Sequence, residues 1–272
     1  MSTQSHAVHP LTARRWADVW PAWLLLGLLG AGAWVFAVTR ARDMGVGPGT
    51  MDVAFLFFAA TWVAMMAAMM LPAIGPLAAQ QGRLIGDGAG RGSALSGAVG
   101  FGAGFLVPWA LYGGLAFLAL IGTGRLVDSS PGAARWLGAG IFVLAGLYQF
   151  TPIKRRALDH CRMHMAAPAG SGPVVGGLLA GLRDGAICVG CCAALMAVFV
   201  ATGVMSVSTM AALALVVFGE KLLPNTRLFR VAVGVILLGF AVAAAVHPAL
   251  LGGLRPVAGT MPMGGAPTMG GV

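Results

Sequence analysis

Three of the four cysteines lie within five residues of one another, at Cys188, Cys191 and Cys192, near the start of a long apolar stretch. On a helix, Cys191 and Cys192 follow Cys188 by three and four positions, so all three sulfur atoms can reach one region of space. A single buried thiol would mean little, because free cysteine packs as a small hydrophobic residue. The clustering instead favours a soft metal ion or thiol–disulfide chemistry.

Other soft or ionisable side chains occur at a few places along the chain. Methionines recur at helical spacing in the segment 65–70, and their thioethers favour Cu(I) as thiolates do. Imidazole ligands would widen the choice of metal to zinc, nickel or Cu(II). The candidate metal ligands are therefore Cys188, Cys191, Cys192, Met66, Met69, Met70, His160, Cys161 and His164, with Asp184, Glu220 and Lys221 in supporting roles.

Each of these groups also has a purely structural interpretation. Methionines fill gaps between helices, and cysteines pack well in a glycine-rich helix. His160 and His164 fit a solvated basic loop. Glu220 and Lys221 fit an ion pair at a membrane surface, whereas in a site Lys221 would hold Glu220 ionised.

The elements that position these residues are predicted to be membrane-spanning helices. The 272 residues are 58% hydrophobic and only 9% charged, with a mean hydropathy of +0.88, whereas soluble domains carry about 25% charged residues. Apolar runs of about 17–25 residues cross a bilayer as helices. The sequence predicts an all-α bundle of seven spans, at 22–38, 53–71, 95–121, 136–151, 186–205, 207–223 and 229–246. The fourth and sixth runs are short, so six spans is the alternative.

The basic side chains predict the orientation of this bundle. The net charge of +9 and the pI near 10.7 are explained by cytoplasmic loops, which collect Lys and Arg, so no nucleic-acid partner is expected. With the N-terminus inside, seven spans place twelve of the 17 basic residues in the cytoplasm and leave outside Arg40, Arg42, Arg125, Arg135 and Arg255. We expect an integral membrane protein, N-in and C-out.

The domain organisation follows from the same pattern. Residues 1–21 form a cytoplasmic tail, and residues 22–247 form one transmembrane domain with a basic cytoplasmic loop at about 152–184. Residues 248–272, rich in Met, Gly and Pro, are expected to be a disordered extracytoplasmic tail. Small-xxx-small spacing at Gly100/Gly104 and at Gly177/Gly181/Gly185 predicts closely packed helices.

This topology brings the candidate ligands to one end of the bundle. The three clustered cysteines, Asp184, the methionines of the second span and the Glu220-Lys221 pair all fall in its cytoplasmic half. Cytoplasmic thiols stay reduced, which argues against a structural disulfide and favours metal binding or transient redox work.

A set of short motifs in a fixed order resembles a known family. The motifs are Met65-Met66-x-x-Met69-Met70-Leu71-Pro72, Tyr148-Gln149-x-Thr151-Pro152-x-Lys154, His160-Cys161, Cys188-x-x-Cys191-Cys192-Ala193-Ala194-Leu195-Met196, Gly203-Val204-Met205 and Glu220-Lys221-x-x-Pro224. Over residues 55–238 they resemble a bacterial family of uncharacterised, predicted metal-binding integral membrane proteins. Ser206 stands where that family has Asn, and Ala193 where it has Trp. The resemblance implies a metal-binding role and a place in the bacterial cytoplasmic (inner) membrane.

Three hypotheses follow. The first is a membrane protein that binds a soft metal, with copper favoured over zinc, and that handles, delivers or transports it rather than acting as an enzyme. Its expected partners are the lipid bilayer and a metal-delivery protein, and a homo-oligomer stays open. The second is a thiol–disulfide oxidoreductase that uses Cys188 and Cys191. The third is a non-catalytic membrane subunit whose cysteines only pack.

Overall fold

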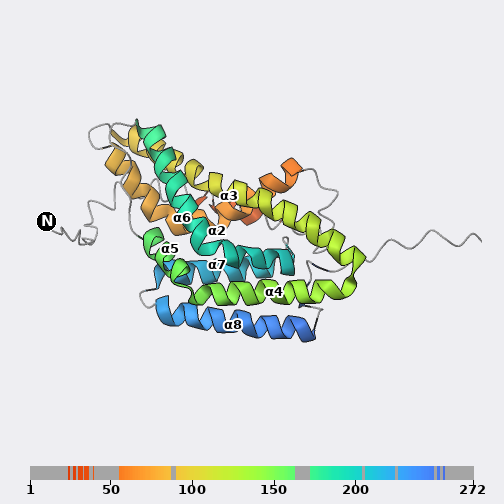
Figure 1. Ribbon diagram of the computed structural model, residues 1–272. Helices are drawn as coiled ribbons and strands as arrows, with labels where there is room; N and C mark the ends of the chain where they lie inside the picture. The colour runs from red at the N-terminus through yellow and green to blue at the C-terminus, as the bar shows by residue number, and fades with distance from the viewer. Residues whose placement is uncertain are drawn as a thin grey trace, which may run out of the picture.

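The computed structural model describes residues 55–86, 90–162, 172–203, 206–223 and 226–247, with single positions between 24 and 39 and at 250, 251 and 254. The described residues form helices and no strands, which confirms the all-α prediction for this part of the chain (Figure 1). The helices are α2 (Phe55–Gly86), α3 (Gly90–Ser129), α4 (Pro131–Phe150), α5 (Pro152–Arg162), α6 (Pro173–Thr202), α7 (Val207–Leu222) and α8 (Thr226–Val246).

The helices pack as two groups, and α6 and α7 each contact helices of both groups. In the first group, α3 lies along α6, and α2 packs against α3 (Figure 1). In the second, α4 pairs with α8, and α7 runs beside them (Figure 1). The short α5 follows α4 and packs mainly against α6. Every helix after α3 therefore has a contact with α6 or with a neighbour of α6.

Glycines hold α3 and α6 in close contact. A Cβ atom added at Gly104 would collide with the carbonyl oxygen of Leu178, and one added at Gly181 would collide with that of Phe101. Gly100, Gly177 and Gly185 meet backbone atoms of the opposite helix in the same way. The small-residue spacing noted in the sequence is thus confirmed as a helix–helix contact.

Four helices in the described ranges are long and apolar enough to cross a membrane. These stretches are Phe55–Pro72, Leu95–Leu126, Pro173–Thr202 and Arg227–Val246, and the bent pair Arg135–Phe150 and Pro152–Cys161 would make a fifth. Of the expected first span, 22–38, the structure describes only scattered positions, and these are helical. The expected sixth span is the helix α7, whose 16 residues are fewer than the 18 taken as the minimum for a span. The described residues therefore support four or five spans.

The segment 152–184 contains two helices where the sequence predicts a basic loop. Pro152 begins α5, which is bent by 68° from α4, and Pro173 begins α6 well before the expected residue 186. Proline suits the first turn of a helix, because its missing N–H would have no partner there. The loop prediction is therefore wrong over these two helices, and the segment outside them, 163–171, is not described.

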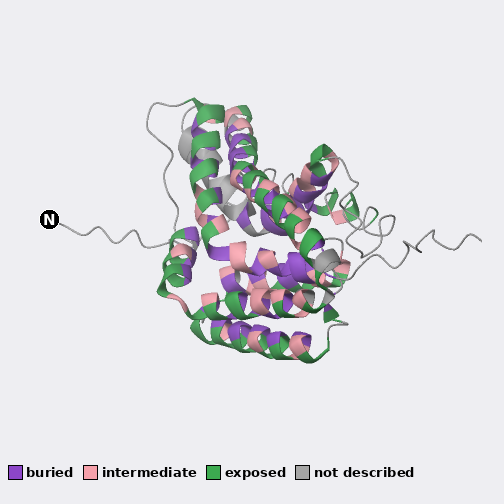
Figure 2. Cartoon of the chain, turned by 45° about the vertical axis from the view of Figure 1, so that its right-hand side comes forward, coloured by how far each residue is buried: buried purple, intermediate pink, exposed green. Residues whose placement is uncertain are grey.

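Apolar side chains cover both the core and the outer faces. Trp62, Trp109 and Phe101 are fully buried between α2, α3 and α6, whereas Leu111 and Leu215 on outer faces are mostly exposed. Figure 2 shows buried residues where helices face one another and exposed residues on the outside. An exterior of large exposed hydrophobic residues is unusual for a protein surrounded by water.

Candidate metal centre

The three clustered cysteines lie on the inner face of α6. Cys188, Cys191 and Cys192 are all fully buried, because spacings of three and four residues place them on one side of the helix. The Cys191 Sγ atom donates to the Cys188 carbonyl at 3.2 Å and lies 3.2 Å from the Cys192 Sγ atom. The sequence prediction that these sulfur atoms share one region of space is confirmed.

A fourth cysteine joins this group from another helix. Cys161 is the next-to-last residue of α5, and its Sγ atom and those of Cys188 and Cys191 all lie within 4.8 Å of one another. All four cysteines are free thiols in the structure. Three converging soft sulfur atoms in a buried site are the donor set that a thiophilic ion such as Cu(I) prefers.

The chain's two tyrosines brace α6 on either side of the Cys191–Cys192 pair. The Tyr148 hydroxyl of α4 donates to the Gly190 carbonyl at 2.6 Å, and the Tyr112 hydroxyl of α3 donates to the Ala193 carbonyl at 2.8 Å. Both hydrogen bonds fix the backbone next to the thiols, as outer partners of metal ligands do. The sequence analysis missed Tyr112 altogether, and gave Tyr148 no role beyond its motif.

Two lysines approach the site. The Lys221 Nζ atom donates to the Cys188 Sγ atom at 3.3 Å and lies 5.9 Å from the centre of the Phe105 ring. The Lys154 Nζ atom lies 2.9 Å from the Glu220 Oε1 atom, and both of these side chains have 0% exposure.

These contacts correct two expectations. Glu220 pairs with Lys154 of α5 rather than with its neighbour Lys221, because consecutive residues on α7 point in different directions. Lys154, expected in a solvated cytoplasmic loop, is fully buried. The clue in the sequence was its place in the Tyr148–Lys154 motif, but no local pattern indicates a partner 66 residues away in the chain.

The methionines of α2 lie in the same buried core as the cysteines. Met66, Met69 and Met70 are each fully inaccessible to solvent, as is Met196, one turn beyond Cys192 on α6. Met196 was part of the family motif, but it was not among the expected ligands. Their thioethers extend the soft, apolar surroundings of the thiols.

Two further predicted residues, His160 and Asp184, are less buried than the cysteines. His160 is exposed on α5, and its Nδ1 atom lies 2.7 Å from the carbonyl oxygen of Arg156, one turn earlier. Asp184 is half-buried one turn before Cys188. His164 lies outside the described residues.

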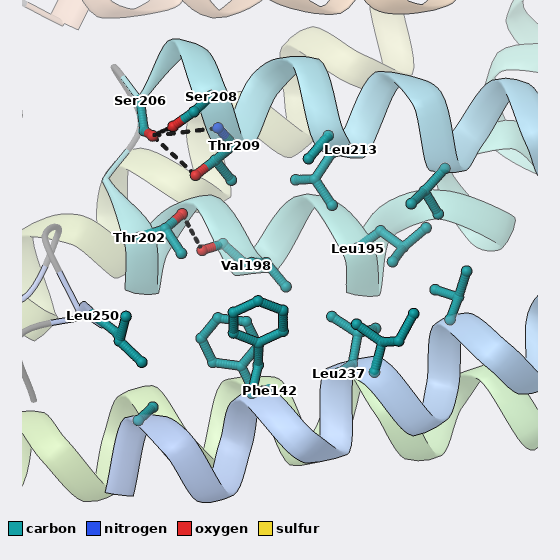
Figure 3. A pocket seen from close by; sticks show the side chains of 16 residues that line it. Phe142, Leu195, Val198, Thr202, Ser206, Ser208, Thr209, Leu213, Leu237 and Leu250 are labelled. Atoms are coloured by element: carbon teal, nitrogen blue, oxygen red, sulfur yellow. Dashed lines mark hydrogen bonds between the residues drawn. The ribbon is translucent and has the colours of Figure 1, made fainter. Parts of the chain in front are cut away.

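A separate pocket of about 550 Å³ lies between α4, α6, α7 and α8 (Figure 3). Hydroxyl groups gather at one end, and apolar side chains cover the rest, including Phe142 and Leu237 (Figure 3). The hydroxyl-bearing residues are Thr202, Ser206, Ser208 and Thr209. Ser206 caps α7 by accepting from the Thr209 N–H, a role that Asn fills equally well. None of the described residues that line this pocket is ionisable or contains sulfur, so its chemistry there does not suit a metal.

The fold and the site together define a helical protein whose interior holds a cluster of free thiols suited to a soft metal ion. A family model described as PpoB2, copper chaperone, matches residues 59–244, more than half of the chain, and the chain belongs to this family. The matched segment contains all four cysteines. The expectation of a metal-related family is thereby confirmed, while its bacterial and membrane parts stay predictions. No curated protein and no solved structure matches the chain.

Proposed function

We propose that this protein is a membrane-embedded copper chaperone that holds Cu(I) on the thiols of Cys161, Cys188 and Cys191 and passes it to a partner protein. The observation that carries the proposal is the convergence of three buried sulfur atoms, from two helices, within 4.8 Å of one another. The membership in a copper chaperone family supports copper as the cargo.

The donor set favours Cu(I) over zinc. Structural zinc sites in proteins are four-coordinate and tetrahedral, whereas the group that converges here has three thiols. Cys192 touches Cys191 but lies outside this group, and the fully buried thioethers of Met66, Met69 and Met70 supply further soft donors to the same core. A site of soft donors alone suits Cu(I), which accepts low coordination numbers.

The distribution of charge and hydrophobicity supports a place in the bacterial inner membrane. Leucines on the outer faces are exposed, as lipid contact requires, whereas Lys154 and Glu220 are paired inside. The excess of basic residues on one predicted side favours the N-in orientation, which puts the thiols toward the reducing cytoplasm. There a soluble copper donor or acceptor would meet the site.

The direct test is metal analysis of the purified protein. The chain is purified in detergent with reductant and without oxygen, loaded with Cu(I) or Zn(II), desalted, and analysed by mass spectrometry for bound metal. Wild type should retain stoichiometric copper, and Cys188→Ser/Cys191→Ser should lose most of it, because Ser offers a hard oxygen in place of a thiolate. Asp159→Ser, at an exposed position on α5, is the control and should keep its copper.

Three results would contradict the proposal. Copper retained by the double Cys variant would place the metal elsewhere, and stoichiometric zinc with no copper would change the cargo. A metal-free wild type with a reversible Cys188–Cys191 disulfide would favour the thiol–disulfide oxidoreductase instead.

A further inference from the structure

The short helix α5 presents a single face to the interior. Lys154, Leu158 and Cys161 are 0%, 2% and 8% exposed, and they follow one another at spacings of four and three residues. Between them, Arg155, Arg156, Asp159 and His160 are exposed. This pattern places Lys154 and Cys161 on one side of the helix, two turns apart. Whatever holds Lys154 in place therefore also governs where Cys161 lies.

Lys154 is held by a partner on a different helix. Its Nζ atom lies 2.9 Å from Glu220 Oε1 near the end of α7, and neither side chain has any accessible surface. Removing one member of such a pair leaves the other charge buried without compensation, which is strongly destabilising. The ion pair thus ties α5 to α7.

Besides this ion pair, α5 is held mainly by its packing against α6. The helix has 11 residues and is bent by 68° from α4, so it is not carried along as a straight extension of that helix. Helices this short are marginal alone and depend on tertiary contacts. Its inner face offers one large apolar side chain, Leu158, besides the lysine and the cysteine.

We propose that the Lys154–Glu220 ion pair is the positioning element that delivers Cys161 to the thiol cluster, so that it sets the number of sulfur ligands. Cys188 and Cys191 belong to one helix and stay together without it, whereas the third thiol arrives only when α5 is docked. The adjacent Lys221 contacts Cys188, so one turn of α7 reaches both parts of the site. This inference rests on the proposed function for its metal arm, but its first test needs no metal.

The first test measures how accessible the Cys161 thiol is in the metal-free protein. The full chain in detergent is alkylated with iodoacetamide under reducing conditions, and modification of Cys161 is followed by peptide mass spectrometry. In Lys154→Met the rate should rise roughly tenfold or more, because loss of a buried charge pair weakens docking of the helix that carries the thiol. The matched control, Arg155→Met, changes an exposed cation on the same helix and should leave the rate unchanged.

The second test counts sulfur ligands in the copper-loaded protein by X-ray absorption spectroscopy. Wild type should show three sulfur neighbours, and Lys154→Met should show two, as Cys161→Ser does. Combining Lys154→Met with Cys161→Ser should cause no further loss, since both changes remove the same ligand. Lys154→Arg, which keeps a cation opposite Glu220, should restore the third sulfur.

Several outcomes separate this inference from the proposed function. If wild type binds no copper while Lys154→Met still exposes Cys161, the positioning role holds and the copper proposal fails. If wild type binds copper and a folded Lys154→Met keeps both slow alkylation and three sulfur ligands, the positioning role is overturned. Should Lys154→Met not fold, as judged by thermal melting, Glu220→Gln decides by the same two criteria, because it removes the charge opposite Lys154 while keeping the size and shape of the side chain.

Discussion

The residue that most directly changes the charge of the proposed site is Lys221. Its ammonium group lies between the Cys188 Sγ atom, at 3.3 Å, and the face of the Phe105 ring. Cu(I) bound by three thiolates carries a net negative charge, which is costly in an apolar interior. A neighbouring cation offsets this charge, and its hydrogen bond to sulfur orients the thiolate.

Lys221→Met should therefore weaken Cu(I) binding without removing a ligand. We expect a loss of affinity of about tenfold, because a hydrogen bond to a charged group contributes on the order of 1.5 kcal/mol. The measurement is competition with a chromogenic Cu(I) chelator at fixed pH. Lys221→Arg keeps the charge and should lose less, and equal affinities for all three proteins would show that the ammonium has no effect on the metal.

The sequence predicts part of this site and misses the rest for a physical reason. The spacing of Cys188, Cys191 and Cys192 along one helix is a local property, so their convergence was predictable. Cys161 was an expected ligand, but its approach to Cys188 and Cys191 depends on the bend after α4 and on the docking of α5. The docking involves tertiary contacts such as the Lys154–Glu220 pair, for which hydropathy and charge counts carry no signal.

At the scale of the elements, the contact between α3 and α6 supports the whole site. It places Gly181 and Gly185, which precede the cysteines on α6, against the backbone of Phe105, and it depends on glycines because the two backbones touch. This contact was predictable from small-residue spacing. The start of α6 was not recognised, because Pro173 lies in a Pro/Gly-rich segment typical of a loop, although it also suits the first turn of a helix.

Gly104→Ala and Gly114→Ala form a matched pair that tests this contact. An added Cβ at Gly104 collides with the Leu178 backbone, whereas one at Gly114 on the same helix meets nothing within 4 Å. We expect Gly104→Ala to lower the free energy of unfolding by about 1–3 kcal/mol, as overpacking does. Gly114→Ala should raise it by up to about 1 kcal/mol, because alanine favours the helix. Thermal melting in detergent measures both, and equal melting temperatures would contradict the close contact.

At the scale of the whole molecule, the proposed membrane topology is the feature that other inferences about compartment depend on. The described residues offer four or five helices that satisfy the length and hydropathy of a span, and the large apolar side chains exposed on their outer faces are compatible with contact with lipid. N-in and C-out termini require an odd number of spans. The position of the C-terminus therefore tests orientation and span count together.

A fusion of alkaline phosphatase to the C-terminus should be active, since this enzyme folds only outside the cytoplasm, where disulfides form. A green fluorescent protein fused to the N-terminus should fluoresce in the same cells and serves as the control for expression. A dark N-terminal fusion with normal expression would reverse the orientation. An inactive C-terminal phosphatase with a fluorescent N-terminus would indicate an even number, as in the six-span alternative.

The two tyrosine hydrogen bonds to α6 have a practical consequence. Tyr112 and Tyr148 are the chain's only tyrosines, and their hydroxyls contact the carbonyls of Ala193 and Gly190, which flank the adjacent cysteines. Biosynthetic incorporation of fluorotyrosine would therefore give a fluorine NMR spectrum of two lines, both from reporters beside the thiols. A shift of the Tyr148 line on its own would report changes on the α4 side of α6, and a shift of the Tyr112 line those on the α3 side. The protein thus carries its own pair of spectroscopic probes, and neither requires an engineered label near a cysteine.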